Sequence, residues 1–309
     1  MRLLVVGAGS TGGYFGGRLA KAGRDVTFLV RPERAARLRS DGLQIVSPHG
    51  DLTLHPQVTT AAEIAKPFDV ILLSVKAFSL EAALRDLTVA VGPETMIVPV
   101  LNGMRHMDLL RDRFGPRAAL GCVCIISATV DAQGRIVQLT PQQRLAYGEL
   151  DGTLTPRVQA LDAFMQGAGF EARLTTTIER EMWEKWTLLA TLGGVTCLMR
   201  GSVGEIVAAA GGLQFVSAFL AEVVAVVRGA GTAPSEAFLA SARAVLTAEG
   251  SALTSSMYRD LQNGGPIEAD QIIGDLLERG RKKDIPVPLI SLAYTNLAVY
   301  QRRRAASPG

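Results

Sequence analysis

The first half of the chain alternates short apolar runs with longer stretches whose apolar residues recur at helical spacing. The apolar runs cover residues 2–6, 25–30, 43–47, 69–74, 96–99 and 119–128. Strands that alternate with helices predict a mainly parallel sheet with helices on both faces. Two later runs, residues 134–138 and 144–147, flank Thr140, Pro141 and Gln142. This spacing predicts an antiparallel hairpin at the sheet edge or at the domain junction.

From residue 176 onward the pattern changes to long helices rich in Ala, Leu and Val, interrupted at residues 229–234 and 263–266. With 309 residues, the chain is long enough for two packed domains. We predict an α/β Rossmann-type N-terminal domain over residues 1–175 and a second, all-helical C-terminal domain over residues 176–309. Because ligands bind at the carboxyl ends of parallel strands, we expect the active site in the cleft beneath a helical lid.

One apolar segment, residues 206–227, is almost long enough to cross a bilayer and carries a single charge, Glu222. Gly211, Gly212, Gln214 and Ser217 interrupt it. We therefore favour a buried helix pair in a large core over membrane insertion. The amino terminus lacks the features of a signal peptide, and we expect a cytoplasmic protein.

A glycine turn follows the first apolar run, in MRLLVVGAGSTGGYFGGRLAKAGRDVTFLVR. In a dinucleotide-binding unit, Gly7 would permit the tight turn, Gly9 would let the backbone approach the pyrophosphate, and Gly12 would allow close packing of helix on strand. The helix that begins near Ser10 and Thr11 would point free N–H groups at the phosphates. The motif lies between a strand and a helix, as this mechanism requires. It predicts a cofactor site rather than a glycine-rich turn without a ligand.

Arg31 ends the second apolar run, where an NAD site places Asp or Glu to accept the ribose hydroxyls. An arginine fork instead suits a 2′-phosphate. Arg31 therefore predicts NADPH as the cofactor. Arg34 and Arg37 either extend this site or cover a solvated helix face.

The charge and the cysteine content of the chain argue against two other classes of function, nucleic-acid binding and metal binding. The formal net charge of +3 and the even spread of Lys and Arg argue against nucleic-acid binding. Cys122, Cys124 and Cys197 cannot all pair, and no zinc-like spacing links them to the three histidines. We expect reduced core thiols, histidines scattered in loops, and no metal site.

Ketone reduction by a nicotinamide needs a hydride donor and a group that supplies a proton to the oxygen. Lys76 and Asn102 follow apolar runs, at the predicted carboxyl ends of strands. Their alternatives are an ordinary helix-start lysine and a left-handed turn residue. Lys185 lies on a helix whose later turns are strongly apolar. It would be a competent general acid if it lines the cleft, and the alternative is that it snorkels to water.

Glu268 and Ser256 add a carboxylate and a hydroxyl to the helical half of the chain. Taken alone, Glu268 is compatible with a surface position and Ser256 with a helix cap. As partners of Lys185, they would complete a site for the reduction of a ketone.

These residues carry a family resemblance. The chain resembles the 2-dehydropantoate 2-reductase (ketopantoate reductase) family over essentially its whole length. The matching segments are GAGSTGGYFGGRLAKAG, Arg31, SVKAF with Lys76, LNGM with Asn102, the helix with Lys185, and TSSMYRD followed by GGPIEAD. The resemblance implies NADPH-dependent reduction of ketopantoate to pantoate in pantothenate biosynthesis. A homodimer through the helical domain is compatible with it.

The resemblance also implies a role for each site residue. Lys185 would be the proton donor, and Glu268 would orient or polarise the site. Asn102 and Ser256 would hold polar groups of the substrate, and Lys76 would lie beside the nicotinamide ribose. The implied cofactor contacts are Gly7, Gly9, Ser10, Thr11, Gly12, Arg31, Lys76, Asn102 and Glu268.

Two positions depart from the family pattern. Where relatives carry asparagines, one and two helical turns after the lysine, this chain has Leu189 and Gly193. These positions share a helix face with Lys185, so hydrogen bonds to a polar substrate would be lost. The alternatives are therefore a reductase of the same architecture for another ketone, such as one more apolar than ketopantoate, or for an imine, and a non-catalytic NADPH sensor.

Overall fold

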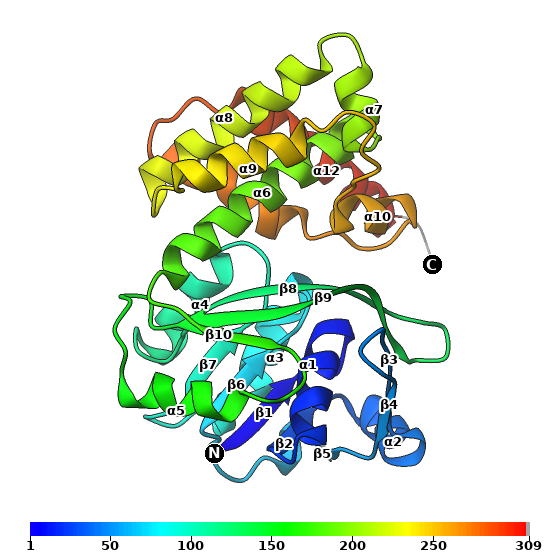
Figure 1. Ribbon diagram of the computed structural model, residues 1–309, viewed down its shortest axis with the longest axis vertical. Helices are drawn as coiled ribbons and strands as arrows, with labels where there is room; N and C mark the ends of the chain where they lie inside the picture. Colours follow the sequence, from blue (N-terminus) through cyan, green and yellow to red (C-terminus); the bar gives the residue numbers. More distant parts are fainter. Residues whose placement is uncertain (307–309) are drawn as a thin grey trace. The chain divides into compact units, whose positions relative to one another are not determined.

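The structure, a computed structural model, describes residues 1–306 (Figure 1). Its contacts divide the chain into two compact units. The first comprises Met1–Leu101 and His106–Glu179, and the second comprises Asn102–Arg105 and the chain from Arg180 onward. Residues 307–309, at the end of the predicted helical domain, lie outside the described residues.

The first unit is built on a five-stranded parallel sheet in the order β5-β2-β1-β6-β7. Its strands are β1 (Arg2–Val6), β2 (Asp25–Leu29), β5 (Gln57–Thr59), β6 (Val70–Leu73) and β7 (Met96–Pro99). The central strand β1 is buried, as a nearly continuous apolar run predicts for a strand covered on both faces. The strand order reverses between β1 and β6, and such switch points bind ligands in open α/β sheets.

A second sheet corrects the prediction of a hairpin between residues 134–138 and 144–147. That prediction is wrong, because these residues form one strand, β9 (Ile136–Gly148), which pairs antiparallel with β8 (Gly121–Val130). The pairing register shifts between Ile126 and Ala128, so Thr140, Pro141 and Gln142 bulge rather than turn. The Gln138 amide holds this bulge by donating to the carbonyl oxygens of Thr140 and Gln142. The sheet also contains β3 (Leu43–Val46), β4 (Leu52–Leu54) and β10 (Glu171–Leu174).

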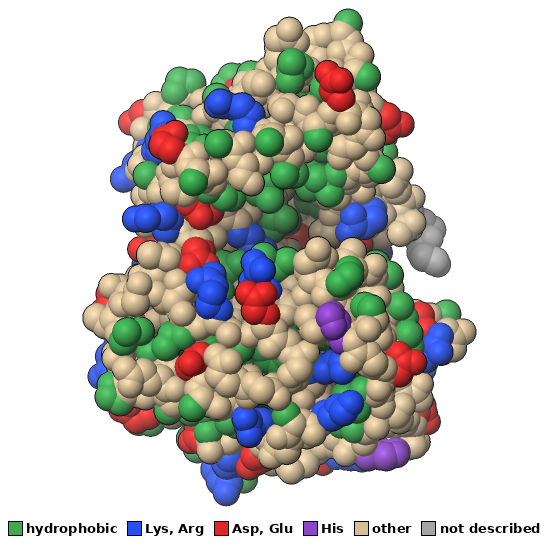
Figure 2. All heavy atoms as spheres, viewed as in Figure 1, with side chains coloured by type: hydrophobic (Ala, Val, Ile, Leu, Met, Phe, Trp, Pro, Cys, Tyr) green, Lys and Arg blue, Asp and Glu red, His purple; other side chains and the backbone are tan. Residues whose placement is uncertain are grey.

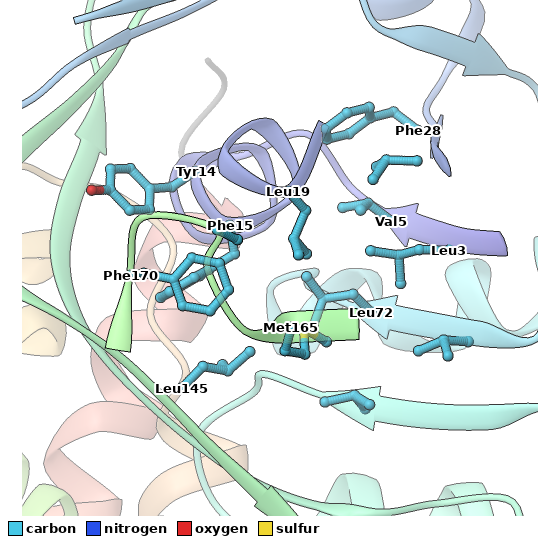
Figure 3. Packing of buried hydrophobic residues seen from close by; sticks show 14 of the residues in the cluster. Leu3, Val5, Tyr14, Phe15, Leu19, Phe28, Leu72, Leu145, Met165 and Phe170 are labelled. Atoms are coloured by element: carbon cyan, nitrogen blue, oxygen red, sulfur yellow. The ribbon is translucent and has the colours of Figure 1, made fainter. Parts of the chain in front are cut away.

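Helix α1 (Ser10–Lys21) contacts strands of both sheets. Three of its glycines make this fit possible, since a Cβ at Gly13, Gly16 or Gly17 would collide with Ile136, Phe28 or Ile45 respectively. Figure 3 shows Phe15 and Leu19 of α1 within an apolar cluster that also contains Leu3, Val5 and Phe170. The other helices of this unit are α2 (Pro32–Asp41), η1 (Ala61–Glu63), η2 (Ala77–Ser79), α3 (Leu80–Asp86), η3 (Thr88–Ala90), α4 (Arg105–Phe114) and α5 (Pro156–Met165).

The second unit is helical throughout its described residues, which confirms the predicted fold class. Its elements are α6 (Ile178–Met199), α7 (Val203–Ala208), α8 (Gly212–Ala230), α9 (Glu236–Leu246), α10 (Ser256–Gln262), the π-helical turn η4 (Asp270–Gly274), α11 (Asp275–Lys282) and α12 (Pro288–Ala306). The breaks expected at residues 229–234 and 263–266 both separate helices.

The apolar segment 206–227 forms a helix pair, as predicted, because α7 ends at Ala208 and α8 begins at Gly212. Within residues 1–306, α8 is the one helix whose length and composition would allow it to cross a membrane. It contacts α7, α9, α11 and α12 of its own unit, and its buried face contributes to their core.

On the face of the molecule seen in Figure 2, acidic and basic side chains are interspersed.

An ion pair between the buried Glu149 and the half-buried Arg157 in the first unit gives a stability prediction. Glu149 is 7% exposed and accepts hydrogen bonds from both Arg157 Nε, at 2.8 Å, and Arg157 Nη2, at 2.7 Å. Replacing Arg157 by Met leaves a buried carboxylate without its counter-charge, and we expect the free energy of unfolding to fall by about 3–5 kcal/mol. Arg144→Met, which breaks the exposed Arg144–Glu171 pair, is the control and should cost less than about 1 kcal/mol.

Denaturant titration followed by circular dichroism measures both losses of stability, and equal losses would contradict the prediction.

Burial raises the pKa of Glu149, but the hydrogen bonds from Arg157 and Thr155 and the charge of Arg157 hold it below its usual value. Because this pKa is lower in the folded state, the stabilisation is complete above the ordinary glutamate value of about 4.3. It is lost as the pH falls through the folded-state value.

Candidate active site

The glycine turn after β1 is shaped by the close approach of α1 to the end of β6. Gly7 has φ of +95°, in the left-handed region, and a Cβ there would lie 2.5 Å from the Ser74 carbonyl oxygen. A Cβ on Gly12 would collide with the Gly7 carbonyl oxygen and with the Ser74 side chain. Gly9, in contrast, faces open space for 4 Å. The turn therefore leaves backbone accessible to a ligand at Gly9.

The N-terminus of α1 adds the electrostatics of an anion site. Gly9 is the N-cap, no side chain caps it, and the first turn, which contains Ser10 and Thr11, has no acidic residue. The first N–H groups of a helix lack intrahelical partners and carry a partial positive charge. This end of α1 therefore suits a phosphate.

A cavity of about 740 Å³ in the first unit extends from this turn across the ends of β2 and β6. Arg31, Arg34 and Lys76 bring positive charge to its wall, and Asp86 brings the opposite charge. The remaining lining residues are Val6, Gly7, Ala8, Gly9, Leu29, Val30, Pro32, Thr60, Ala61, Ala62, Ser74, Val75, Phe78, Ser79, Ala82 and Ala83. The glycine turn and the three cations thus share one cavity.

The three arginines near the end of β2 have different surroundings. Arg31 is the exposed N-cap residue of α2. Arg34 is half-buried and donates to the Gly134 carbonyl oxygen at 3.3 Å, and its burial lowers its pKa without removing its charge. Arg37 is exposed and lies beside Gly134, in the turn between β8 and β9. Arg31 and Arg34 line the cavity, whereas Arg37 covers a solvated face.

Lys76 and Asn102 follow β6 and β7 but fall in different units. Lys76 is exposed and lines the cavity of the first unit. Asn102 belongs to the second unit and is half-buried. It is not the left-handed residue of its turn, because that conformation occurs at Gly103, with φ of +79°. A Cβ on Gly103 would lie 2.5 Å from the Gln271 carbonyl oxygen, so this turn packs on η4.

Lys185 and Glu268 occupy segments of the second unit that are joined by a hydrogen bond. Both side chains are half-buried. The residue after Lys185, Trp186, donates its indole N–H to the Ile272 carbonyl oxygen at 3.0 Å. The Ile272 N–H donates to the Glu268 carbonyl oxygen, also at 3.0 Å. The segments that carry Asn102, Lys185 and Glu268 therefore meet around η4.

Ser256 is the exposed first residue of α10, and the helix cap is its neighbour Ser255. The Ser255 hydroxyl accepts from the Tyr258 N–H at 2.9 Å and lies 3.0 Å from the Thr196 hydroxyl of α6. The alternative interpretation of Ser256 as the cap is therefore wrong. The paired serines in TSSMYRD were the available signal, because either can cap a helix.

The face of α6 beyond Lys185 is apolar. Leu189 is half-buried one turn later. Gly193 is buried, and a Cβ there would lie 2.9 Å from the Met257 methyl carbon of α10. Met257 thus occupies the space beside Gly193, a contact that the sequence pattern did not reveal.

The cysteines and histidines contribute no cluster to this site. Cys122, Cys124 and Cys197 are buried thiols that form no disulfide, as predicted. The expectation that all histidines lie in loops is wrong for His106, which is buried in α4. It lies on the helix face that packs into the core together with Met107 and Leu110. Residues 1–306 contain no group of three His, Cys, Asp or Glu side chains arranged to hold a metal ion.

The parallel sheet, the glycine turn and the cavity at its strand ends define a dinucleotide-binding α/β unit, here joined to an all-helical unit. The chain belongs to the ketopantoate reductase PanE/ApbA family, because the model of that family matches residues 3–152 and the model of its C-terminal part matches residues 177–301. The family resemblance expected from the sequence is thereby confirmed. The chain is an oxidoreductase of this family.

Two curated relatives span the chain. It is 34% identical to an uncharacterized oxidoreductase, YkpB, of Bacillus subtilis over 98% of its own length and 100% of that protein. It is 28% identical to a 2-dehydropantoate 2-reductase of Halobacterium salinarum, with 98% and 99% covered. Among solved structures, a 2-dehydropantoate 2-reductase from Geobacter metallireducens matches with a TM-score of 0.85 and 28% identity, over 97% of this chain and 99% of that one.

Proposed function

We propose that the protein uses NADPH to reduce ketopantoate to pantoate. The choice of NADPH as cofactor rests on the cavity of the first unit. There Arg31 and Arg34 occupy the place at which an NAD site needs an acidic residue. Two guanidinium groups supply donors for a 2′-phosphate. The uncapped start of α1 and the open backbone at Gly9 suit the pyrophosphate.

When bound, NADPH would supply the hydride that reduces the carbonyl carbon of the substrate. Lys185 donates a proton to the carbonyl oxygen and regains one from solvent, and its positive charge stabilises the developing alkoxide. Glu268 orients the lysine and the cofactor. Asn102 and Ser256 hold polar groups of the 2-oxo acid, and Lys76 binds beside the nicotinamide ribose.

The family supports this assignment at the level of the reaction class. We place the reaction in pantothenate biosynthesis and the protein in the cytoplasm, where buried thiols stay reduced. The homodimer through the helical domain stays a prediction.

A second candidate substrate is favoured by the contact between Met257 and Gly193. This contact and Leu189 make the α6 face beyond Lys185 hydrocarbon. A substrate hydroxyl placed there would lack a partner, at a cost of about 1–3 kcal/mol. An apolar 2-oxo acid would lose nothing. The second candidate is therefore NADPH-dependent reduction of a 2-oxo acid with a hydrocarbon side chain.

Steady-state oxidation of NADPH separates these candidates, with NADH as the cofactor control. The informative substrate pair is ketopantoate and trimethylpyruvate, which lacks only the hydroxyl. Turnover of ketopantoate supports the first candidate, and a clear preference for trimethylpyruvate supports the second. Tight NADPH binding without turnover of any 2-oxo acid would contradict both and leave an imine reductase or a sensor.

The variant Leu189→Asn tests the pocket directly. An amide at this position gives a substrate hydroxyl a partner, and we expect kcat/KM for ketopantoate to rise about 10-fold. The value for trimethylpyruvate should stay constant or fall. An equal change for both substrates would show that residue 189 does not contact the hydroxyl.

A further inference from the structure

Trp186 links two segments to which the proposed function assigns chemistry. It is 1% exposed, and its indole N–H donates to the Ile272 carbonyl oxygen across 86 positions of sequence. Ile272 lies within η4, and its own N–H donates to the Glu268 carbonyl oxygen. Two hydrogen bonds in series therefore connect the residue after Lys185 to the backbone of Glu268.

The connection is made at a π-helical turn of the backbone. In η4 the Asp275 N–H bonds to the Asp270 carbonyl oxygen, five residues earlier, which is π-helical spacing. Such turns are wider than an α-helix and occur frequently at functional sites. The donor that α6 supplies to the Ile272 carbonyl oxygen favours one placement of this turn.

We propose that Trp186 is a positioning residue for the reaction: its indole N–H holds η4 on α6 and so fixes Glu268 relative to Lys185. The proposal rests on the roles assigned to Lys185 and Glu268. Trp186 is 1% exposed, so the role assigned to it is positioning and not catalysis. Its expected effect is on turnover, since a catalytic group displaced by about 1 Å can lose 10²-fold in rate.

The chain contains its own matched control. Trp183 precedes Trp186 by one turn of α6 and is also buried, at 4% exposed. The two rings lie 5.4 Å apart, and the Arg279 guanidinium is 5.6 Å from one ring and 5.7 Å from the other. The Trp183 Nε1 atom, however, has no hydrogen-bond partner among residues 1–306. Replacing either Trp by Phe removes similar ring area, but only one replacement removes a hydrogen bond.

The experiment compares Trp186→Phe with Trp183→Phe in the full chain. We expect Trp186→Phe to lower kcat about 10- to 100-fold. NADPH binding should weaken by no more than about threefold, because the cavity with the glycine turn and Arg31 belongs to the first unit and only the contact of Glu268 is disturbed. Trp183→Phe should keep kcat within about twofold, since its indole N–H makes no bond to lose. Equal kcat values for the two variants, with an active wild-type protein, would overturn the proposal and leave the proposed function intact.

Hydrogen exchange gives a readout that does not depend on activity. Exchange of the amides in residues 268–276 should speed up in Trp186→Phe and stay at the wild-type rate in Trp183→Phe. Equal exchange in both variants would overturn the proposal even if no substrate is turned over. Should either variant fold poorly, benzothienylalanine at position 186 keeps the shape of indole and replaces its N–H by sulfur. This variant should likewise show a lower kcat and faster exchange of the amides in residues 268–276.

Discussion

Replacing Lys185 by Ala is expected to lower kcat for 2-oxo acid reduction by about 10²- to 10⁴-fold, the range of a lost general acid. The alkoxide that forms at the substrate oxygen then has neither a proton donor nor a neighbouring positive charge. The dissociation constant for NADPH should stay nearly constant, because the cavity with the glycine turn and Arg31 is built entirely by the first unit.

Turnover and NADPH binding are measured separately, by NADPH oxidation and by fluorescence titration. Lys283→Ala is the control, since this lysine of the same unit is exposed at the end of α11. It removes the same charge without affecting the proposed proton donor. An unchanged kcat in Lys185→Ala would remove this residue from the mechanism, and a parallel loss of NADPH affinity would indicate a structural role.

Arg31→Asp is expected to weaken NADPH binding about 100-fold, with little change for NADH. Losing a hydrogen bond to a charged group costs about 1.5–3 kcal/mol, and the new carboxylate adds repulsion toward the 2′-phosphate. The same carboxylate is able to accept hydrogen bonds from the ribose hydroxyls of NADH. Selectivity between the two cofactors should therefore shift toward NADH.

Isothermal titration with each cofactor measures this shift. Arg37→Asp is a matched control, because it makes the same charge change on the same helix at an exposed residue outside the cavity. Equal loss for NADPH and NADH in Arg31→Asp would assign Arg31 a structural role. Equal loss of NADPH binding in both variants would mean that net charge, and not a contact, is responsible.

The parts of the fold that were predictable from the sequence depend on local signals. Strands β1, β6 and β7 of the parallel sheet are nearly continuous apolar runs, and β1 ends at the glycine turn. Edge strand β5 has the sequence QVT and was not predicted, because it has no such apolar run. The course of β9 was not predictable in this way. Thr140, Pro141 and Gln142 look like a turn locally, but the pairing partner β8 and the Gln138 amide hold them in a bulge.

In the candidate site, too, features with a local sequence signal were predictable and features that depend on distant contacts were not. Lys185, Glu268 and Asn102 were predicted as site residues because each residue type has its own chemistry and lies in a recognisable segment. Their common neighbour η4 was not predicted, since the bond from Trp186 to Ile272 joins residues that are distant in sequence. The choice between Ser255 and Ser256 as a helix cap likewise depends on the Thr196 hydroxyl of another helix.

The glycines of α1 have a consequence for how the phosphate site comes into being. Gly12, Gly13, Gly16 and Gly17 lie within one helix of 12 residues, and each glycine weakens an isolated helix by about 1 kcal/mol relative to alanine. Such a segment has little tendency to be helical by itself, and contacts with both sheets must stabilise it. The anion-binding end of α1 is thus a product of tertiary assembly. Cofactor affinity then reports on the cooperative folding of the whole first unit, including strands that never approach the ligand.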